Sequence, residues 1–237
     1  MLVASFPALA AGTNCYVLAV DEGQECIVVD PGIGVEAQLA EVLSQHRVRP
    51  AAVLLTHGHL DHVYAVTPVC GAAGVAAYIH HDDRYRLRDP LAGVGAPLLA
   101  MLRQEFGARQ WREPDDVIGI TGGAELEIAG LWVGVTHAPG HTEGSVIFGL
   151  DGVPDGGSVG VSFSEDSSST VLTGDVVFAG SIGRSDLPGG DGQTMQRSLR
   201  EVVLPLADDT LLLPGHGPAT TMRRERATNP FLQGLAP

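Results

Sequence analysis

Seven residues of the chain, Thr-His-Gly-His-Leu-Asp-His at positions 56–62, follow directly on the apolar run 51–55. An apolar run that ends in polar side chains predicts a buried strand that presents those side chains at its carboxyl end. His57 and His59 lie two positions apart and can face the same way, while Asp61 and His62 would open a helix. Imidazole nitrogens and carboxylate oxygens are ligands that zinc prefers. The cluster therefore indicates a metal site rather than a polar surface loop.

An apolar run followed by a potential ligand recurs three times later in the chain. The runs are 133–136, 171–173 and 211–214, and the ligands after them are His141, Asp175 and His216. A glycine accompanies each ligand and lets the backbone turn sharply, which a site crowded by several loops needs. The four strand ends together predict one shared site.

These ligands are too many for one tetrahedral ion, so we predict two divalent ions. Zn²⁺ is expected, with Fe or Mn as alternatives, and paired ions of this kind lie about 3.5–4 Å apart and share an oxygen ligand. The predicted ligands of the first ion are His57, His59 and His141, and those of the second are Asp61, His62 and His216. Asp175, alone on its loop, would bridge the two. Asp61 and Asp175 are the catalytic candidates.

Composition excludes several classes of function. The formal net charge of −14 argues against a nucleic-acid partner, because phosphate binding relies on Lys and Arg. All 14 basic residues are arginine, which excludes chemistry that needs a lysine Schiff base. Cys15, Cys26 and Cys70 are odd in number and widely spaced, so we expect free thiols rather than disulfides.

Length and hydropathy predict a single cytoplasmic domain. A chain of 237 residues with 44% hydrophobic content suits one domain with a substantial core. The N-terminus is apolar over residues 2–11 but lacks a basic leader, and no run approaches the about 18 apolar residues of a membrane span. We expect a protein that binds neither nucleic acid nor membrane, and the oligomeric state stays open.

Hydrophobic periodicity predicts alternating strands and helices in the first part of the chain. Strands are expected at 14–20, 25–30, 51–55 and 75–79, and helices at 36–46 and from Asp61 to Gly71 or Gly74. An alternation of strand, helix and strand makes parallel pairs.

The later part of the chain predicts shorter elements. Residues 80–111 read as an inserted side segment with a short helix at 97–106. Apolar runs at 125–128, 131–136, 145–150 and 171–173 predict an antiparallel meander, and the Gly-, Ser- and Asp-rich stretch 151–170 a long mobile hairpin loop. Helices are expected at 194–206 and 219–228, with a strand at 211–214.

The order His-x-His-x-Asp-His, then His, Asp and His, each at a strand end, resembles the metallo-β-lactamase fold superfamily over residues 14–217. The resemblance implies an α+β fold, a four-layer αββα sandwich with the metal site along one edge between the two sheets. Within it, residues 138–142, 173–175 and 180–186 are most similar to compact bacterial glyoxalase II-like hydrolases. The Arg-Glu-Arg at 224–226 and residues 229–231 match that type as well.

The resemblance implies hydrolysis of a small-molecule thioester or thiol conjugate such as S-lactoylglutathione, with a metal-bridging hydroxide as nucleophile. A bound metal lowers the pKa of water from about 15.7 to about 7, so no strong protein base is needed. The alternative is a persulfide dioxygenase with one iron held by His57, His141 and Asp175. Other hydrolases of the fold, a lactonase or a phosphodiesterase, remain open, whereas a non-catalytic binding module would show degraded ligands.

Candidate substrate contacts are arginines. Full-length glyoxalase II enzymes carry a C-terminal helical domain that supplies much of the glutathione site, whereas 21 residues follow His216 here (237 − 216). Arg223, Arg224 and Arg226 are candidates for pairing with substrate carboxylates, against the alternative of a solvated helix face. Arg184 is a further candidate, or forms a structural ion pair with Asp186.

Three other polar positions have structural alternatives. His137 lies four residues before His141, and we do not count it among the ligands. The His-His-Asp-Asp at 80–83 is expected to cap a helix start and complement its dipole. Asp30, at a strand end ahead of Pro-Gly, either orients a histidine from behind or is a plain turn residue.

Overall fold

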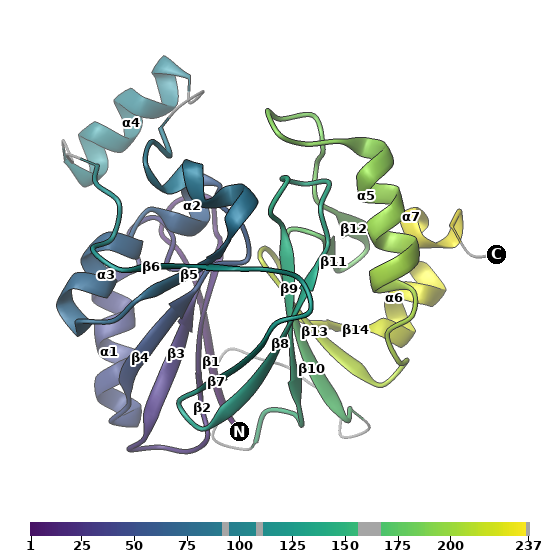
Figure 1. Cartoon of the computed structure of the whole chain (residues 1–237), viewed down its shortest axis with the longest axis horizontal. Coiled ribbons are helices and arrows are strands. Elements are labelled where there is room, and N and C mark those ends of the chain that lie inside the picture. Colours follow the sequence, from purple (N-terminus) through teal and green to yellow (C-terminus); the bar gives the residue numbers. More distant parts are fainter. Residues whose placement is uncertain (92–94, 108–110, 156–166, 236–237) are drawn as a thin grey trace.

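Two facing β-sheets form the centre of the computed structural model, which describes residues 1–91, 95–107, 111–155 and 167–235 (Figure 1). The first sheet has the strand order β1-β2-β3-β4-β5-β6, and the second has the order β14-β13-β10-β9-β8-β7. Helices cover the outer face of each sheet (Figure 1). This arrangement confirms the predicted α+β class and the four-layer αββα sandwich.

The first sheet is mixed. Its strands are β1 (Leu2–Pro7), β2 (Asn14–Ala19), β3 (Glu25–Val29), β4 (Arg49–Leu54), β5 (Ala77–His80) and β6 (Val117–Ile120). The first three pair antiparallel, and β3 to β6 pair parallel. Parallel neighbours need a crossover, and α1 (Glu36–His46), α2 (Leu60–Val63) and α3 (Val66–Ala73) supply two of them.

The second sheet contains the predicted meander. β7 (Glu125–Ile128), β8 (Leu131–His137), β9 (Val146–Asp151) and β10 (Ser169–Gly174) pair antiparallel in succession. β13 (Thr210–Pro214) joins β10 in parallel after α5 (Gly192–Ser198) and the π-helical η2 (Leu199–Val203), and β14 (Thr220–Thr221) closes that edge. α6 (Met222–Thr228) and α7 (Pro230–Gln233) follow, and β11 (Val177–Phe178) and β12 (Ser181–Ile182) form a small ribbon.

The core fills the space between all four layers. Successive side chains of a strand point to opposite faces, so a strand covered on both sides is apolar at every position. In β2, Leu18 packs between the sheets with Phe148, while its neighbour Val17 faces the first helical layer. On the far side, Met195 and Leu199 pack against the outer face of the second sheet. This double-sided packing holds the strand ends that carry the predicted ligands.

Several predicted boundaries are wrong for identifiable reasons. The helix expected from Asp61 is interrupted, because the N–H of Ala65 donates to the carbonyl of Pro31 instead of extending α2. The helix expected from residue 219 begins only at Met222, since Thr220 and Thr221 pair with β13. The helix expected at 194–206 ends its α-helical part at Ser198. The strands β1, β6, β11, β12 and β14 were not predicted.

The side segment contains the 3-10 helix η1 (His81–Leu87) and α4 (Ala96–Phe106). α4 lies at the outer rim of the first helical layer (Figure 1), and its Leu102 packs with Ile33 and Leu60. The loop predicted at 151–170 falls largely on residues 156–166, which lie outside the described residues. None of the helices seen in the described ranges is long and apolar enough to cross a membrane.

Candidate metal centre

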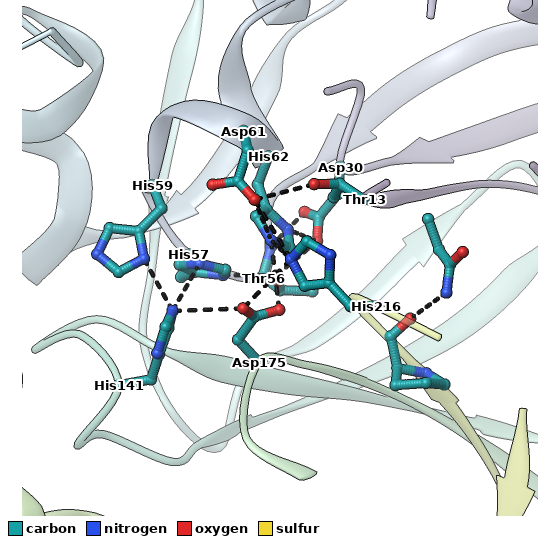
Figure 2. Close-up of polar contacts among 12 residues, drawn as sticks. Thr13, Asp30, Thr56, His57, His59, Asp61, His62, His141, Asp175 and His216 are labelled. Atoms are coloured by element: carbon teal, nitrogen blue, oxygen red, sulfur yellow. Dashed lines mark hydrogen bonds and ion pairs between the residues drawn. The ribbon is translucent and has the colours of Figure 1, made fainter. Parts of the chain in front are cut away.

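All seven predicted ligands converge where strands of both sheets end (Figure 2). His57 and His59 follow β4, and Asp61 and His62 lie in α2. His141 lies between β8 and β9, Asp175 directly follows β10, and His216 follows β13. The structure thus brings together side chains separated by up to 159 positions (216 − 57).

The ligands form two groups. The imidazole group consists of His57, His59 and His141, with His141 Nε2 at 2.8 Å from His59 Nδ1 and 3.1 Å from His57 Nε2. The mixed group consists of Asp61, His62 and His216, with His216 Nε2 at 3.2 Å from Asp61 Oδ2 and 3.4 Å from His62 Nε2. Each group matches one of the two predicted ligand sets.

Asp175 lies between the two groups. Its Oδ1 is 3.3 Å from His62 Nε2, and its Oδ2 is 3.5 Å from His216 Nε2 and 3.6 Å from His141 Nε2. Oδ1 is buried without a hydrogen-bond donor in the described part of the chain. A buried carboxylate oxygen without a donor is costly unless a cation neutralises it. Asp175 therefore has the position that a bridging ligand needs.

The spacing of the ligand atoms suits divalent cations. Ligands held at about 2.0–2.1 Å in a tetrahedron lie about 3.3 Å from one another. The contacts within the two groups, 2.8 to 3.6 Å, scatter around that value. The two groups are therefore able to hold metal ions.

Hydrogen bonds behind the ligands orient three of the rings. His62 Nδ1 donates to Asp30 Oδ2 at 2.8 Å, and His57 Nδ1 lies 3.1 Å from Thr56 Oγ1, which itself donates to Asp30 at 2.6 Å. His141 Nδ1 donates to the carbonyl of Arg184 at 2.7 Å. A ring that donates through Nδ1 leaves Nε2 as the free ligand atom. Of the two alternatives for Asp30, the structure favours orientation of a histidine.

Asp83 corrects the sequence interpretation of residues 80–83. His80 does cap η1, since its side chain accepts from the N–H of Asp82. Asp83 instead is fully buried and accepts from Gly58 N at 2.7 Å, Thr142 Oγ1 at 2.7 Å and Gly144 N at 2.9 Å. It ties the loop of His57 and His59 to the loop of His141. A run of four polar residues could not show this, because all three donors lie far away in sequence.

The two groups differ in their electrostatics. Burial and the charges of neighbouring histidines hold the pKa of His57 well below its usual range, and burial lowers the pKa of His59 to about 3. Burial acts on His62 in the same direction, but Asp175, Asp61 and Asp30 outweigh it and raise its pKa well above the usual range. Before a cation binds, the imidazole group therefore presents neutral rings, while the mixed group carries charge of both signs.

The loop of His216 is held by the N-terminal hairpin. Asn14 Nδ2 donates to the carbonyls of Pro214 and Gly217 at 2.9 and 2.8 Å, and the hydroxyl of Tyr16 donates to Pro214 at 2.6 Å. A Cβ at Gly215 would lie 2.2 Å from Asp175 Oδ1, so only glycine permits this approach. The Pro-Gly-His sequence thus serves close packing at the site.

Three of the predicted substrate arginines lie on α6. Arg226 donates to Asp208 at 2.9 Å and to the carbonyls of Leu204 and Leu206, so its guanidinium anchors α6 to the segment before β13. Its substrate role stays a prediction. Arg223 and Arg224 are exposed on α6, and their role stays a prediction.

Arg184 and His137 take structural contacts. The Arg184 guanidinium pairs with Asp186 at 2.7 and 2.8 Å, as the structural alternative expected, while its carbonyl holds His141. His137 Nε2 lies 2.8 Å from the carbonyl of Glu143, outside both ligand groups.

A family model described as the metallo-beta-lactamase superfamily matches residues 10–216. The chain belongs to this superfamily. The match spans all seven ligands and agrees with the range that the sequence motifs indicated. Superfamily membership, together with ligand groups able to hold metal, supports a metal-dependent hydrolase.

Three relatives are informative about function and metal. The chain is 31% identical to the hydroxyacylglutathione hydrolase GloC of Haemophilus influenzae, with 98% of each chain covered. It is 32% identical to the BLEG-1 B3 metallo-β-lactamase, whose crystal structure matches with a TM-score of 0.75 over 98% of this chain and 100% of the other. TTHA1623, solved in a di-iron-bound form, matches at 32% identity and a TM-score of 0.72 over 96% and 99%.

Proposed function

We propose that this chain is a binuclear metallohydrolase that cleaves thioesters such as S-lactoylglutathione. One observation carries the proposal: a single carboxylate, Asp175, contacts His62, His141 and His216 at 3.3 to 3.6 Å and so faces both ligand groups. Such a shared oxygen ligand is characteristic of paired metal ions. The similarity to GloC over nearly the whole length supports a thioester as the substrate class.

Zinc is the metal that we expect in both groups. Five of the seven ligands are histidines and two are aspartates, a donor set that suits Zn²⁺. Imidazole and carboxylate ligands also suit iron, and the di-iron form of TTHA1623 makes iron the alternative to test.

In the proposed reaction, the two groups position water and the thioester carbonyl on either side of Asp175. When bound, the two ions supply a water of lowered pKa and polarise the carbonyl. The water oxygen bonds to the carbonyl carbon, the carbon–sulfur bond breaks, and its electron pair leaves with the sulfur. One water proton ends on the thiol and the other is released from the carboxylic acid product. A thiol has a pKa near 8.5, so it leaves as a thiolate with little acid assistance.

The chain's own residues supply orientation. Asp30, Thr56 and the carbonyl of Arg184 fix which ring nitrogens face the reaction site. Asp61 accepts a hydrogen bond from Thr13 Oγ1 at 2.9 Å and remains partly exposed, so it lies at the boundary between the ligands and solvent. We assign Asp61 and Asp175 as the acidic residues next to the reacting atoms.

The test combines metal analysis with a substrate panel. Protein as purified is analysed for metal content and assayed for hydrolysis of S-lactoylglutathione, cleavage of a β-lactam, and oxygen uptake with glutathione persulfide. We expect two metal ions per chain and thioester hydrolysis. One iron per chain with oxygen uptake would instead establish a persulfide dioxygenase. Cleavage of the β-lactam alone would also overturn the proposal.

A further inference from the structure

A cavity of about 460 Å³ opens beside the ligand cluster, and both ligand groups reach it. Its lining includes His59 of the imidazole group, Asp61 of the mixed group, and Tyr85, Arg86, Asp89 and Leu187 from the side segment and the loop before α5. We refer to it as the entrance cavity. His59 and Asp61 border both the ligand cluster and this space, so we place the thiol carrier of a bound thioester in it. The volume suits a small-molecule ligand.

We propose that the entrance cavity selects a thiol carrier that brings no free carboxylate into it, so that glutathione conjugates are not the preferred substrates. This inference rests on the proposed thioester hydrolysis and adds to it the chemical class of the carrier. It depends on how the cationic side chains around the cavity are engaged.

The arginine in the lining is already neutralised. Arg86 donates to Glu143 Oε2 at 2.8 Å and to the carbonyl of Pro188 at 2.9 Å, and its Nε lies 3.4 Å from Asp83 Oδ1. Its aliphatic part packs on Gly58, where an added Cβ would lie 2.7 Å from Arg86 Cδ. The Arg86 guanidinium therefore already has two carboxylate neighbours, Glu143 and Asp83, and is held in one position. A substrate carboxylate would have to compete with both.

Three further arginines in the described part of the chain are paired as well. Arg84 and Arg88 contact Glu113 at 3.3 and 3.6 Å, and Arg184 contacts Asp186 at 2.7 Å. Of the acids in the described lining, Asp61 belongs to the mixed ligand group, and Asp89 lies outside both groups; the one lining cation is Arg86, and the chain has no lysine.

Glutathione would bring two carboxylates, besides its one ammonium group, to a cavity with the acid Asp89 and with its lining cation Arg86 already engaged. Like charges brought together in a partly closed site weaken binding, which is a common basis of specificity. The remaining lining, with Leu60, Pro90, Leu187 and Pro188, suits an apolar or uncharged carrier.

The decisive comparison uses two substrates of similar shape that differ in charge, S-lactoylglutathione and its diethyl ester. For metal-loaded protein we expect kcat/KM to be about tenfold higher for the ester than for the free acid. The difference should lie in KM and not in kcat, because an interaction that is the same in the ground state and the transition state changes KM alone. Equal values, or a preference for the free acid, would overturn the inference.

Binding without turnover separates the two proposals. The dissociation constants of S-propylglutathione and its diethyl ester, measured by calorimetry, should differ in the same direction. If the ester binds more tightly but neither thioester is hydrolysed, the proposed function fails and the cavity selectivity stands. If thioesters are hydrolysed and the free acid binds as well as the ester, only the selectivity fails.

A variant that lacks one charge of the lining tests whether that charge contributes to the preference for the ester. Asp89→Asn removes an acid from the lining and should reduce the preference for the ester by about two- to fivefold, as expected for a partly screened charge. Asp151→Asn removes the same charge from an exposed position at the end of β9 and should leave the preference unchanged. An unchanged preference in Asp89→Asn, or an equal change in both variants, would contradict the inference.

Discussion

The two ligand groups have equal numbers of side chains but are supported by different chemistry. In the imidazole group the rings of His57 and His141 contact uncharged oxygens, those of Thr56 and the Arg184 carbonyl. In the mixed group His62 is backed by the carboxylate of Asp30, and Asp61 adds a second negative charge. A carboxylate behind a histidine raises its basicity as a ligand. Two ligand groups at the same edge of the sandwich can therefore differ in the charge that supports them. We expect the mixed group to bind its cation more tightly than the imidazole group.

Asp175 contacts both ligand groups, so its substitution should have the largest effect and should weaken metal binding in both. Asp175→Asn keeps the shape but removes the shared negative charge. We expect S-lactoylglutathione hydrolysis to fall about a thousandfold and both ions to bind more weakly. Turnover and metal content of the purified variant check this expectation. If metal content is unchanged, Asp175 is not a shared ligand.

Removing one ligand from each group tests whether the two sites are separate. His59→Ala should lose the ion of the imidazole group and keep the other, whereas His216→Ala should do the reverse. We expect turnover to fall about a hundredfold or more in each, because water activation and carbonyl polarisation need both ions. Elemental analysis should find about one ion per chain in either variant. Loss of both ions from a single substitution would show one cooperative site.

Support from behind the ligands should produce a smaller effect that is largest in the mixed group, because Asp30 contacts His62 directly and reaches His57 only through Thr56. Asp30→Asn leaves every ligand in place but removes the carboxylate behind His62, so the ion of the mixed group should bind about 10- to 100-fold more weakly. Titration with a chelator measures the affinity of each group for its ion. We expect the wild-type protein to release the ion of the imidazole group first. Unchanged release from the variant would contradict a supporting role for Asp30.

The convergence of the candidate ligands could be predicted from the sequence because each lies within a few residues of the end of an apolar run. Position after a strand is a local signal, and it was enough to predict that His57, Asp175 and His216 lie close together. The αββα sandwich was predicted from the resemblance that these motifs carry. Both predictions depend on motifs that span only a few consecutive residues.

The residues missed are those whose role depends on distant loops. Asp83 accepts from donors 25 to 61 positions away, so its place in the sequence resembles an ordinary helix start. The interruption after α2 depends on the carbonyl of Pro31, and no periodicity of the helix reveals it. The engagement of Arg226 with Asp208 and two carbonyls likewise becomes visible only when α6 is packed.

The smallest expected effect concerns Thr13, which bonds the mixed group alone. Its Oγ1 donates to Asp61 Oδ2 at 2.9 Å, and Thr13→Val removes that donor with little change in shape. A hydrogen bond of about 0.5–1.5 kcal/mol corresponds to a roughly 2- to 10-fold weaker affinity for the ion of the mixed group. Thr170→Val is the matched control, since Thr170 is equally buried but donates to the carbonyl of Gly152 in the second sheet. Chelator titration of both variants should show a change for Thr13→Val alone. A change in the ion of the imidazole group instead would mean that the two groups are not independently supported, and the contrast between them would fail.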